Sequence, residues 1–65
     1  MENIIAIEDR KFLIFDSIEN ENDINTTDTV IDNKKYSVES TNSDIELYYI
    51  TAKPDYEYIG YAIEV

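Results

Sequence analysis

The chain has 65 residues, of which 15 are acidic and five are basic, so its formal net charge at pH 7 is −10. It has no cysteine and no histidine, which excludes a disulfide framework, thiolate metal sites and histidine-based acid–base catalysis. No apolar run approaches the roughly 20 residues that span a bilayer, and the N-terminus lacks a signal-peptide pattern. We therefore expect a single cytoplasmic domain. A surface this acidic repels nucleic-acid phosphate and anionic lipid, which indicates a basic protein partner and neither direct nucleic-acid binding nor membrane binding.

The N-terminal part predicts two strands. Residues 3–8 are apolar and β-branched and favour a strand, with a short helical turn as the alternative. A turn at Asp9-Arg10 is the expected connection to the second strand. Residues 12–15 form an unbroken apolar run, which is typical of a strand buried on both faces. We expect the rest of the fold to pack around this strand.

Residues 16–33 are the most acidic part of the chain, with six acids and no base. Asn, Asp, Ser and Thr are frequent there, and these side chains compete with regular backbone hydrogen bonding. Three structures fit the pattern: a short helix that starts at a threonine and buries Val30 and Ile31, a strand over residues 29–32, or a solvated loop. We interpret this segment as the working surface of the protein.

Three further strands are expected in the C-terminal half, over residues 35–39, 45–52 and 58–65. Turn-forming clusters separate them, which predicts an antiparallel meander. Gly60, the only glycine, indicates a bulge or a close backbone approach. The predicted fold class is α+β, or nearly all-β, with a small antiparallel sheet of about four to five strands and one short helix or acidic loop packed beside it.

No pattern of catalytic or metal-ligating residues stands out, so we expect neither enzymatic activity nor a cofactor. Ser17 has no histidine to activate it, and the chain has no glycine-rich phosphate loop. Six tyrosines pack a thin sheet or form an interface, and Tyr56 and Tyr58 are the two expected to be most exposed.

Two local patterns carry a resemblance to a known family. An apolar strand that ends in an acidic residue, Ser and Ile occurs at Leu13, Ile14, Asp16, Ser17 and Ile18, and an acidic segment with Val and Ile follows at Asp28, Val30 and Ile31. The closing segment has comparable residues at Thr51, Pro54, Asp55, Tyr56, Ala62 and Ile63. In these features the chain resembles the phage-encoded uracil-DNA glycosylase inhibitors, small acidic proteins that mimic DNA.

The resemblance implies that the apolar strand lies along the DNA-binding groove of the enzyme and that carboxylates of the acidic segment stand in for phosphates. It also implies an apolar pocket for a leucine that the enzyme otherwise inserts into DNA, lined here by Val30, Ile31, Val38 and Ile50. The predicted partner-binding residues are Asp16, Ser17, Ile18, Glu19, Glu21, Asp28, Val30, Ile31, Val38 and Ile50.

The predicted partner is uracil-DNA glycosylase or another basic nucleic-acid-binding protein, in the bacterial host cytoplasm if the chain is phage-encoded. Two alternatives stay open. One is an acidic inhibitor of another host-defence protein, of the anti-CRISPR or anti-restriction kind. The other is a small non-catalytic β interaction module.

Overall fold

The computed structural model describes residues 3–15 and 21–65 and, for Glu21, the backbone alone. The elements in chain order are β1 (Ile4–Ile7), β2 (Arg10–Phe15), the 3-10 turn η1 (Glu21–Asp23), β3 (Thr26–Asp32), β4 (Tyr36–Thr41), β5 (Leu47–Ala52) and β6 (Glu57–Glu64). No helix among these residues is long and apolar enough to cross a membrane.

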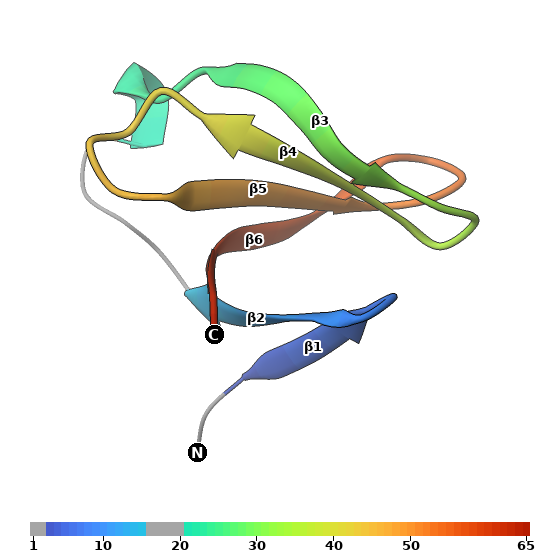
Figure 1. Ribbon diagram of the computed structural model, residues 1–65. Helices are drawn as coiled ribbons and strands as arrows, with labels where there is room; N and C mark the ends of the chain where they lie inside the picture. Colours follow the sequence, from blue (N-terminus) through green and yellow to red (C-terminus); the bar gives the residue numbers. More distant parts are fainter. Residues whose placement is uncertain (1–2, 16–20) are drawn as a thin grey trace.

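The strands form a single six-stranded antiparallel sheet in the order β1-β2-β6-β5-β4-β3. The sheet is strongly twisted and curls on itself (Figure 1). The predicted antiparallel meander is confirmed, since β4, β5 and β6 are consecutive neighbours. The predicted small antiparallel sheet is confirmed, but the described residues form six strands where four to five were expected. Their only helical element is the short turn η1, so they are nearly all-β and not α+β.

The most deeply buried strand is β5, not the apolar run in β2. Phe12 is fully buried, but Leu13, Ile14 and Phe15 are only half-buried. β5 buries side chains on both faces, because Tyr48 and Ile50 face one side of the sheet and Leu47 and Thr51 face the other. An apolar run shows that a strand is buried, but it does not say which strands become its neighbours. β2 lies next to the edge strand β1, and this placement leaves it half covered.

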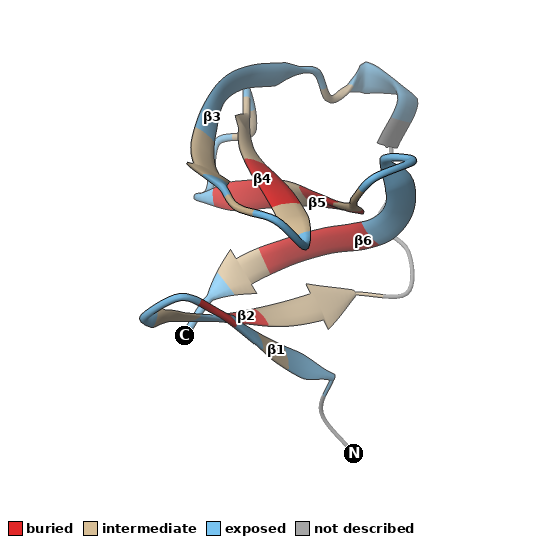
Figure 2. Ribbon diagram, turned by 90° about the vertical axis from the view of Figure 1, so that its right-hand side faces the viewer, coloured by how far each residue is buried: buried red, intermediate tan, exposed pale blue. Residues whose placement is uncertain are grey.

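The core lies on the concave face of the sheet. It consists of Ile7, Phe12, Val38, Tyr48, Ile50 and Ala62. Figure 2 shows the buried parts of β4, β5 and β6 in the middle of the sheet, with largely exposed strands at its edges. Within residues 3–15 and 21–65 no helix covers these apolar side chains, so the curled sheet itself encloses them.

Gly60 on β6 lies against Ile14 and Phe15 of β2. A Cβ atom added at this position would be 2.8 Å from Ile14 Cγ2 and 3.2 Å from the carbonyl oxygen of Phe15. The register of β5 against β6 shifts beside it, so that Ile59 is an extra residue on β6. The expected bulge and close approach at Gly60 are both confirmed.

Three alternatives were considered for residues 16–33, and the strand is the one found: β3 (Thr26–Asp32) includes the predicted residues 29–32. The predicted helix with Val30 and Ile31 as its buried face is wrong, because both lie in β3. Val30 and Ile31 both pack against the core. Two register shifts interrupt the pairing of β3 with β4. These irregularities explain why the segment lacks the alternation of a regular strand.

The connection between β1 and β2 is one residue earlier than predicted. Ile7 pairs with Arg10, so the turn is Glu8-Asp9 and not Asp9-Arg10. Glu8 has a backbone φ of 57°, a left-handed conformation that residues other than glycine, Asn and Asp seldom adopt. The residues at the turn therefore do not carry the usual signal of a two-residue hairpin.

Candidate protein-binding surface

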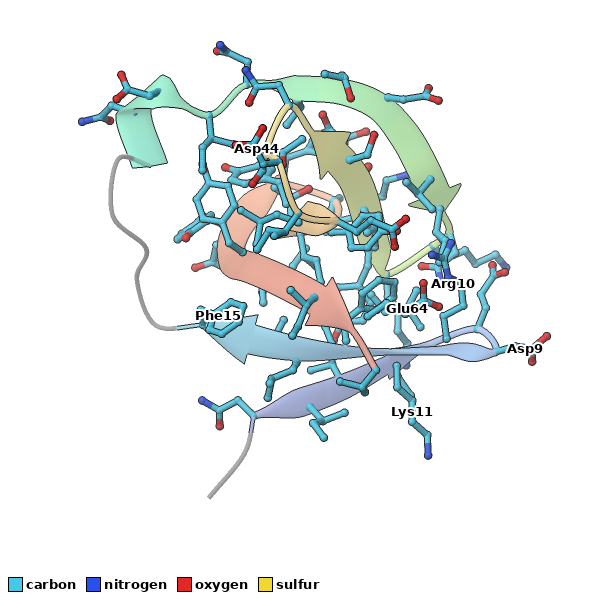
Figure 3. The ribbon with its side chains drawn as sticks, turned by 60° about the vertical axis from the view of Figure 1, so that its left-hand side comes forward. Asp9, Arg10, Lys11, Phe15, Asp44 and Glu64 are labelled. Atoms are coloured by element: carbon cyan, nitrogen blue, oxygen red, sulfur yellow. The ribbon has the colours of Figure 1, made fainter. Side chains whose placement is uncertain are left out.

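Exposed carboxylates are carried by neighbouring segments at one end of the sheet. We name this surface the acidic end and define it by Asp23 in η1, Asp28 in β3, and Asp44 and Glu46 in the turn between β4 and β5. Figure 1 shows η1 and this turn on the same side of the molecule. In Figure 3, Asp44 lies well away from Asp9 and Lys11 at the β1–β2 hairpin.

Hydrogen bonds hold the backbone of the acidic end. The Asn25 N–H donates to Asn42 Oδ1 (3.1 Å), and the Asn42 N–H donates to the Asn25 carbonyl (3.0 Å). Within the turn, the Thr41 hydroxyl donates to the Leu47 carbonyl (2.9 Å), and the Ser43 N–H donates to Thr41 Oγ1 (3.3 Å). Asn, Ser and Thr side chains therefore satisfy the polar groups of the turns, and the carboxylates project from a fixed framework.

The bases of the chain lie elsewhere. They are Arg10 and Lys11 at the start of β2, Lys34 and Lys35 in the turn after β3, and Lys53 after β5. In Figure 1 these three places lie on the side opposite η1. Two of the bases are also in ion pairs, Arg10 with Glu64 and Lys53 with Asp32. The bases are therefore confined to the side opposite η1, and the acidic end has no base among the residues that the structure describes. The side with the bases also has exposed carboxylates, at Glu8, Asp9, Asp32, Asp55 and Glu57.

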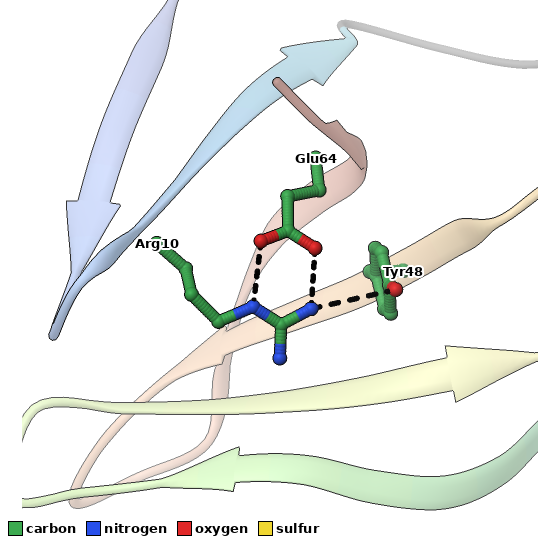
Figure 4. Close-up of polar contacts among 3 residues, drawn as sticks. All are labelled: Arg10, Tyr48 and Glu64. Carbon is green, nitrogen blue, oxygen red and sulfur yellow. Dashed lines mark hydrogen bonds and ion pairs between the residues drawn. The ribbon is translucent and has the colours of Figure 1, made fainter.

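Arg10, at the start of β2, forms polar contacts with Glu64 of β6 and Tyr48 of β5 (Figure 4). Its Nε donates to Glu64 Oε2 (2.7 Å) and its Nη2 donates to Glu64 Oε1 (2.5 Å), a paired geometry that fixes the guanidinium. The guanidinium carbon lies 5.4 Å from the ring centre of Phe12 and 5.7 Å from that of Tyr48. These hydrogen bonds raise the pKa of Arg10 and lower the pKa of the Glu64 carboxyl. This cluster covers one end of the core, and we interpret it as structural.

Tyrosines cover part of the convex face near the end of β5 and the start of β6. The rings of Tyr49 and Tyr58 are stacked with centroids 5.4 Å apart, and Tyr61 meets Tyr49 edge-on at 5.3 Å. Tyr56 and Tyr58 are 58% and 45% exposed, and they are the most exposed tyrosines, as the sequence predicts. The exposed carboxylates of Asp55 and Glu57 flank them. The Lys53 ammonium lies 5.8 Å from the ring centre of Tyr56, so a base of the chain itself already contacts this aromatic surface.

The predicted partner-binding residues fall into three groups. Asp16, Ser17, Ile18 and Glu19 lie outside the described residues, and so does the side chain of Glu21, whose backbone belongs to η1. Asp28 is exposed on β3 and belongs to the acidic end. The four residues proposed to line a pocket, Val30, Ile31, Val38 and Ile50, belong to the core or pack against it.

The predicted leucine pocket is not seen among residues 3–15 and 21–65, where no cavity opens. Val38 and Ile50 are both 0% exposed, so a partner cannot reach them while the core is closed. Val30 and Ile31 are half-buried on β3 and keep some surface for contact. Of the four residues, only Val30 and Ile31 therefore keep accessible surface, and the described residues form no hole beneath β3.

Sequence reasoning missed Asp23, Asp44 and Glu46. Residues 40–44 are recognisable as a turn, but nothing local shows that this turn adjoins η1. Their proximity depends on the pairing of β3 with β4 and on the two hydrogen bonds between Asn25 and Asn42.

Comparison of the chain with family models, with curated proteins and with solved structures gives no match.

Proposed function

We propose that this protein is an acidic DNA-mimic inhibitor, which places its acidic end in the DNA-binding groove of a basic enzyme and blocks that enzyme. The observation that carries the proposal is the placement of the charges: the carboxylates of the acidic end project from a hydrogen-bonded framework, and the bases lie on the opposite side. A groove that binds DNA must be positively charged to hold phosphates. A chain with a net charge of −10 is attracted to such a groove before contact.

Uracil-DNA glycosylase is the proposed target, and the support for it is the resemblance of residues 13–18 and of the closing segment. β2 is paired with β1 on one side and with β6 on the other, so its backbone hydrogen bonds are already used. Contact with the enzyme groove therefore falls to the residues after Phe15, where the predicted Asp16, Ser17 and Ile18 lie. The acidic end then extends the contact along the groove.

The experiment is release of uracil from a single-stranded oligonucleotide by a purified bacterial uracil-DNA glycosylase at physiological salt. A stoichiometric amount of this protein is expected to abolish release, and added DNA is expected to restore it by competition. Full excision in the presence of a large excess of the folded protein contradicts this target. The proposal then moves to another basic host-defence enzyme, such as a CRISPR effector or a restriction enzyme.

The exposed rings of Tyr56 and Tyr58 favour a second candidate, a small non-catalytic interaction module that uses the aromatic surface. The two candidates respond differently to salt. Binding through the acidic end weakens as salt rises, whereas binding through aromatic contacts changes little. Measured over a salt series, the affinity for any identified partner separates them.

A further inference from the structure

The two edge strands of the sheet differ in how they are protected. β3 has two register shifts against β4 and exposes Asp28 and Asp32. Bulges and charges of this kind prevent an edge strand from pairing with another chain. β1 has neither: its four residues, all apolar, pair in regular register with β2. Among the residues that the structure describes, β1 is therefore the less protected of the two edges.

The backbone of β1 has hydrogen-bonding groups that β2 does not use. In an antiparallel pair, alternate residues of a strand bond to the neighbour, and the residues between them point their N–H and C=O groups to the other side. The carbonyl of Asn3 accepts a hydrogen bond from β2 (2.7 Å), and Ile5 and Ile7 share its alternation. The N–H and C=O groups of Ile4 and Ala6 therefore point outward, toward the open side of β1.

We propose that β1 binds an extended strand of a protein partner, which continues the sheet by backbone pairing and has an apolar stretch followed by basic residues at one end. The apolar stretch suits the side chains of Ile4, which is 44% exposed, and Ala6. The basic end suits the exposed Glu8 and Asp9, which follow β1 in the turn to β2. Lys11 lies opposite Ala6 on β2, and this base disfavours a positive charge in the middle of the partner strand.

A second copy of this chain is a poorer occupant of the edge. Two copies at −10 repel each other. A basic partner strand is attracted by the negative charge of the chain, whereas a second copy is repelled by it. This inference goes beyond the proposed function, because β1 is separate from the acidic end and the pairing does not depend on which enzyme is inhibited.

The test uses a short synthetic peptide of alternating valine and threonine with two lysines at one end. The chain is labelled with ¹⁵N, and amide hydrogen exchange is followed with and without the peptide. The N–H groups of Ile4 and Ala6 are expected to become protected when the peptide binds. A control peptide with the same side chains, but with N-methyl groups on alternate amides, is expected to bind at least about tenfold more weakly, because it cannot donate to the edge.

A matched pair of variants tests the same geometry from the side of the chain. Ala6→Pro removes an outward N–H that β2 does not use, so the fold is expected to survive while peptide affinity falls by about tenfold. Ala6→Val keeps the N–H and is expected to bind the peptide as the native chain does. Far-UV circular dichroism and thermal unfolding confirm that each variant is folded. If Ala6→Pro does not fold, the difference in affinity of the native chain for the peptide and for its N-methylated control tests the proposal instead.

Three results overturn the proposal. One is equal binding of the two peptides, which shows attraction by charge alone. Another is peptide-induced protection in β3 with none at Ile4 and Ala6. The third is protection of Ile4 and Ala6 that rises with the concentration of the chain in the absence of peptide, which shows self-association. Uracil release does not bear on any of these outcomes, so this proposal and the proposed function fail or stand separately.

Discussion

Replacement of Gly60 by alanine tests the account of how the sheet closes. The new Cβ would lie 2.8 Å from Ile14 Cγ2, where contacts between carbon atoms are favourable at about 3.5–4.0 Å. Its second neighbour, at 3.2 Å, is the backbone carbonyl of Phe15. Neither yields easily, because the Ile14 side chain is stiff at χ1 and the carbonyl belongs to β2. β2 and β6 must therefore separate locally, or Ile14 must leave its rotamer.

The expected cost follows from two opposing effects. Overpacking of this kind costs about 1–3 kcal/mol. Gly60 has no positive φ, so alanine fits its backbone and recovers about 0.4–1 kcal/mol through the unfolded state. The net loss is about 1–2 kcal/mol, which lowers the melting temperature of a domain of this size by about 5–15 °C.

Thermal and urea unfolding of Gly60→Ala measure this loss, and the double variant Gly60→Ala/Ile14→Ala is the control. Removal of the Ile14 side chain beyond Cβ relieves the clash, so the two losses are expected to be less than additive by at least about 0.5 kcal/mol. A Gly60→Ala variant as stable as the native chain, or losses that simply add, would refute the reasoning.

Three further predictions concern the core, the ion pair and the first turn. Phe12→Ala is expected to lower the free energy of unfolding by about 3–5 kcal/mol, because Phe12 is fully buried, whereas Leu13→Ala at the half-buried neighbour costs less; chemical unfolding compares them. The pKa of Glu64 lies below its ordinary value of 4.5, so its pairing with Arg10 stabilises the fold above that pH and is lost as the pH falls through the folded pKa. The stability gap between the native chain and Glu64→Gln, measured by unfolding from pH 7 to pH 3, should therefore narrow in acid, and a gap independent of pH contradicts the assigned pairing. Glu8→Gly is expected to stabilise the turn by about 0.5 kcal/mol, because glycine adopts positive φ freely, while Asp9→Gly, at a position without positive φ, is expected to destabilise it.

Local patterns predict much of the strand content of this fold. The apolar and alternating runs that become β1, β2, β5 and β6 are clear in the sequence, and so are the turn clusters between the last three strands. Gly60 is also recognisable as a point of close approach. These features depend on neighbours in sequence, which is why reasoning from short windows finds them.

The order of the strands and the nature of β3 depend on contacts between distant residues. The apolar run at Phe12 suggests a central strand, but its position is set by which strands pair with it, and β1 takes one side and β6 the other. In β3, the register shifts around Thr29 and Ile31 break the alternation that identifies a strand. The acidic end is likewise invisible locally, since Asp28 and Asp44 come together only through the pairing of β3 with β4.

The central claim is that the acidic end is the surface that faces a basic partner. Two variants with equal charge test it, each with four carboxylates changed to amides. The first changes the acidic end, at Asp23, Asp28, Asp44 and Glu46, and the second changes exposed carboxylates elsewhere, at Glu8, Asp9, Asp55 and Glu57. Both variants lose four negative charges, so a difference between their association rates depends on the position of the carboxylates and not on the total charge.

The measurement is the association rate of each folded variant with purified uracil-DNA glycosylase over a range of salt concentrations. Electrostatic steering changes association rates by about 10–10³-fold and depends steeply on salt. The account predicts that the acidic-end variant associates at least about tenfold more slowly than the native chain at low salt, with a weaker dependence on salt, and that the second variant loses much less. Equal rates for the two variants would contradict the claim that the acidic end is the binding surface.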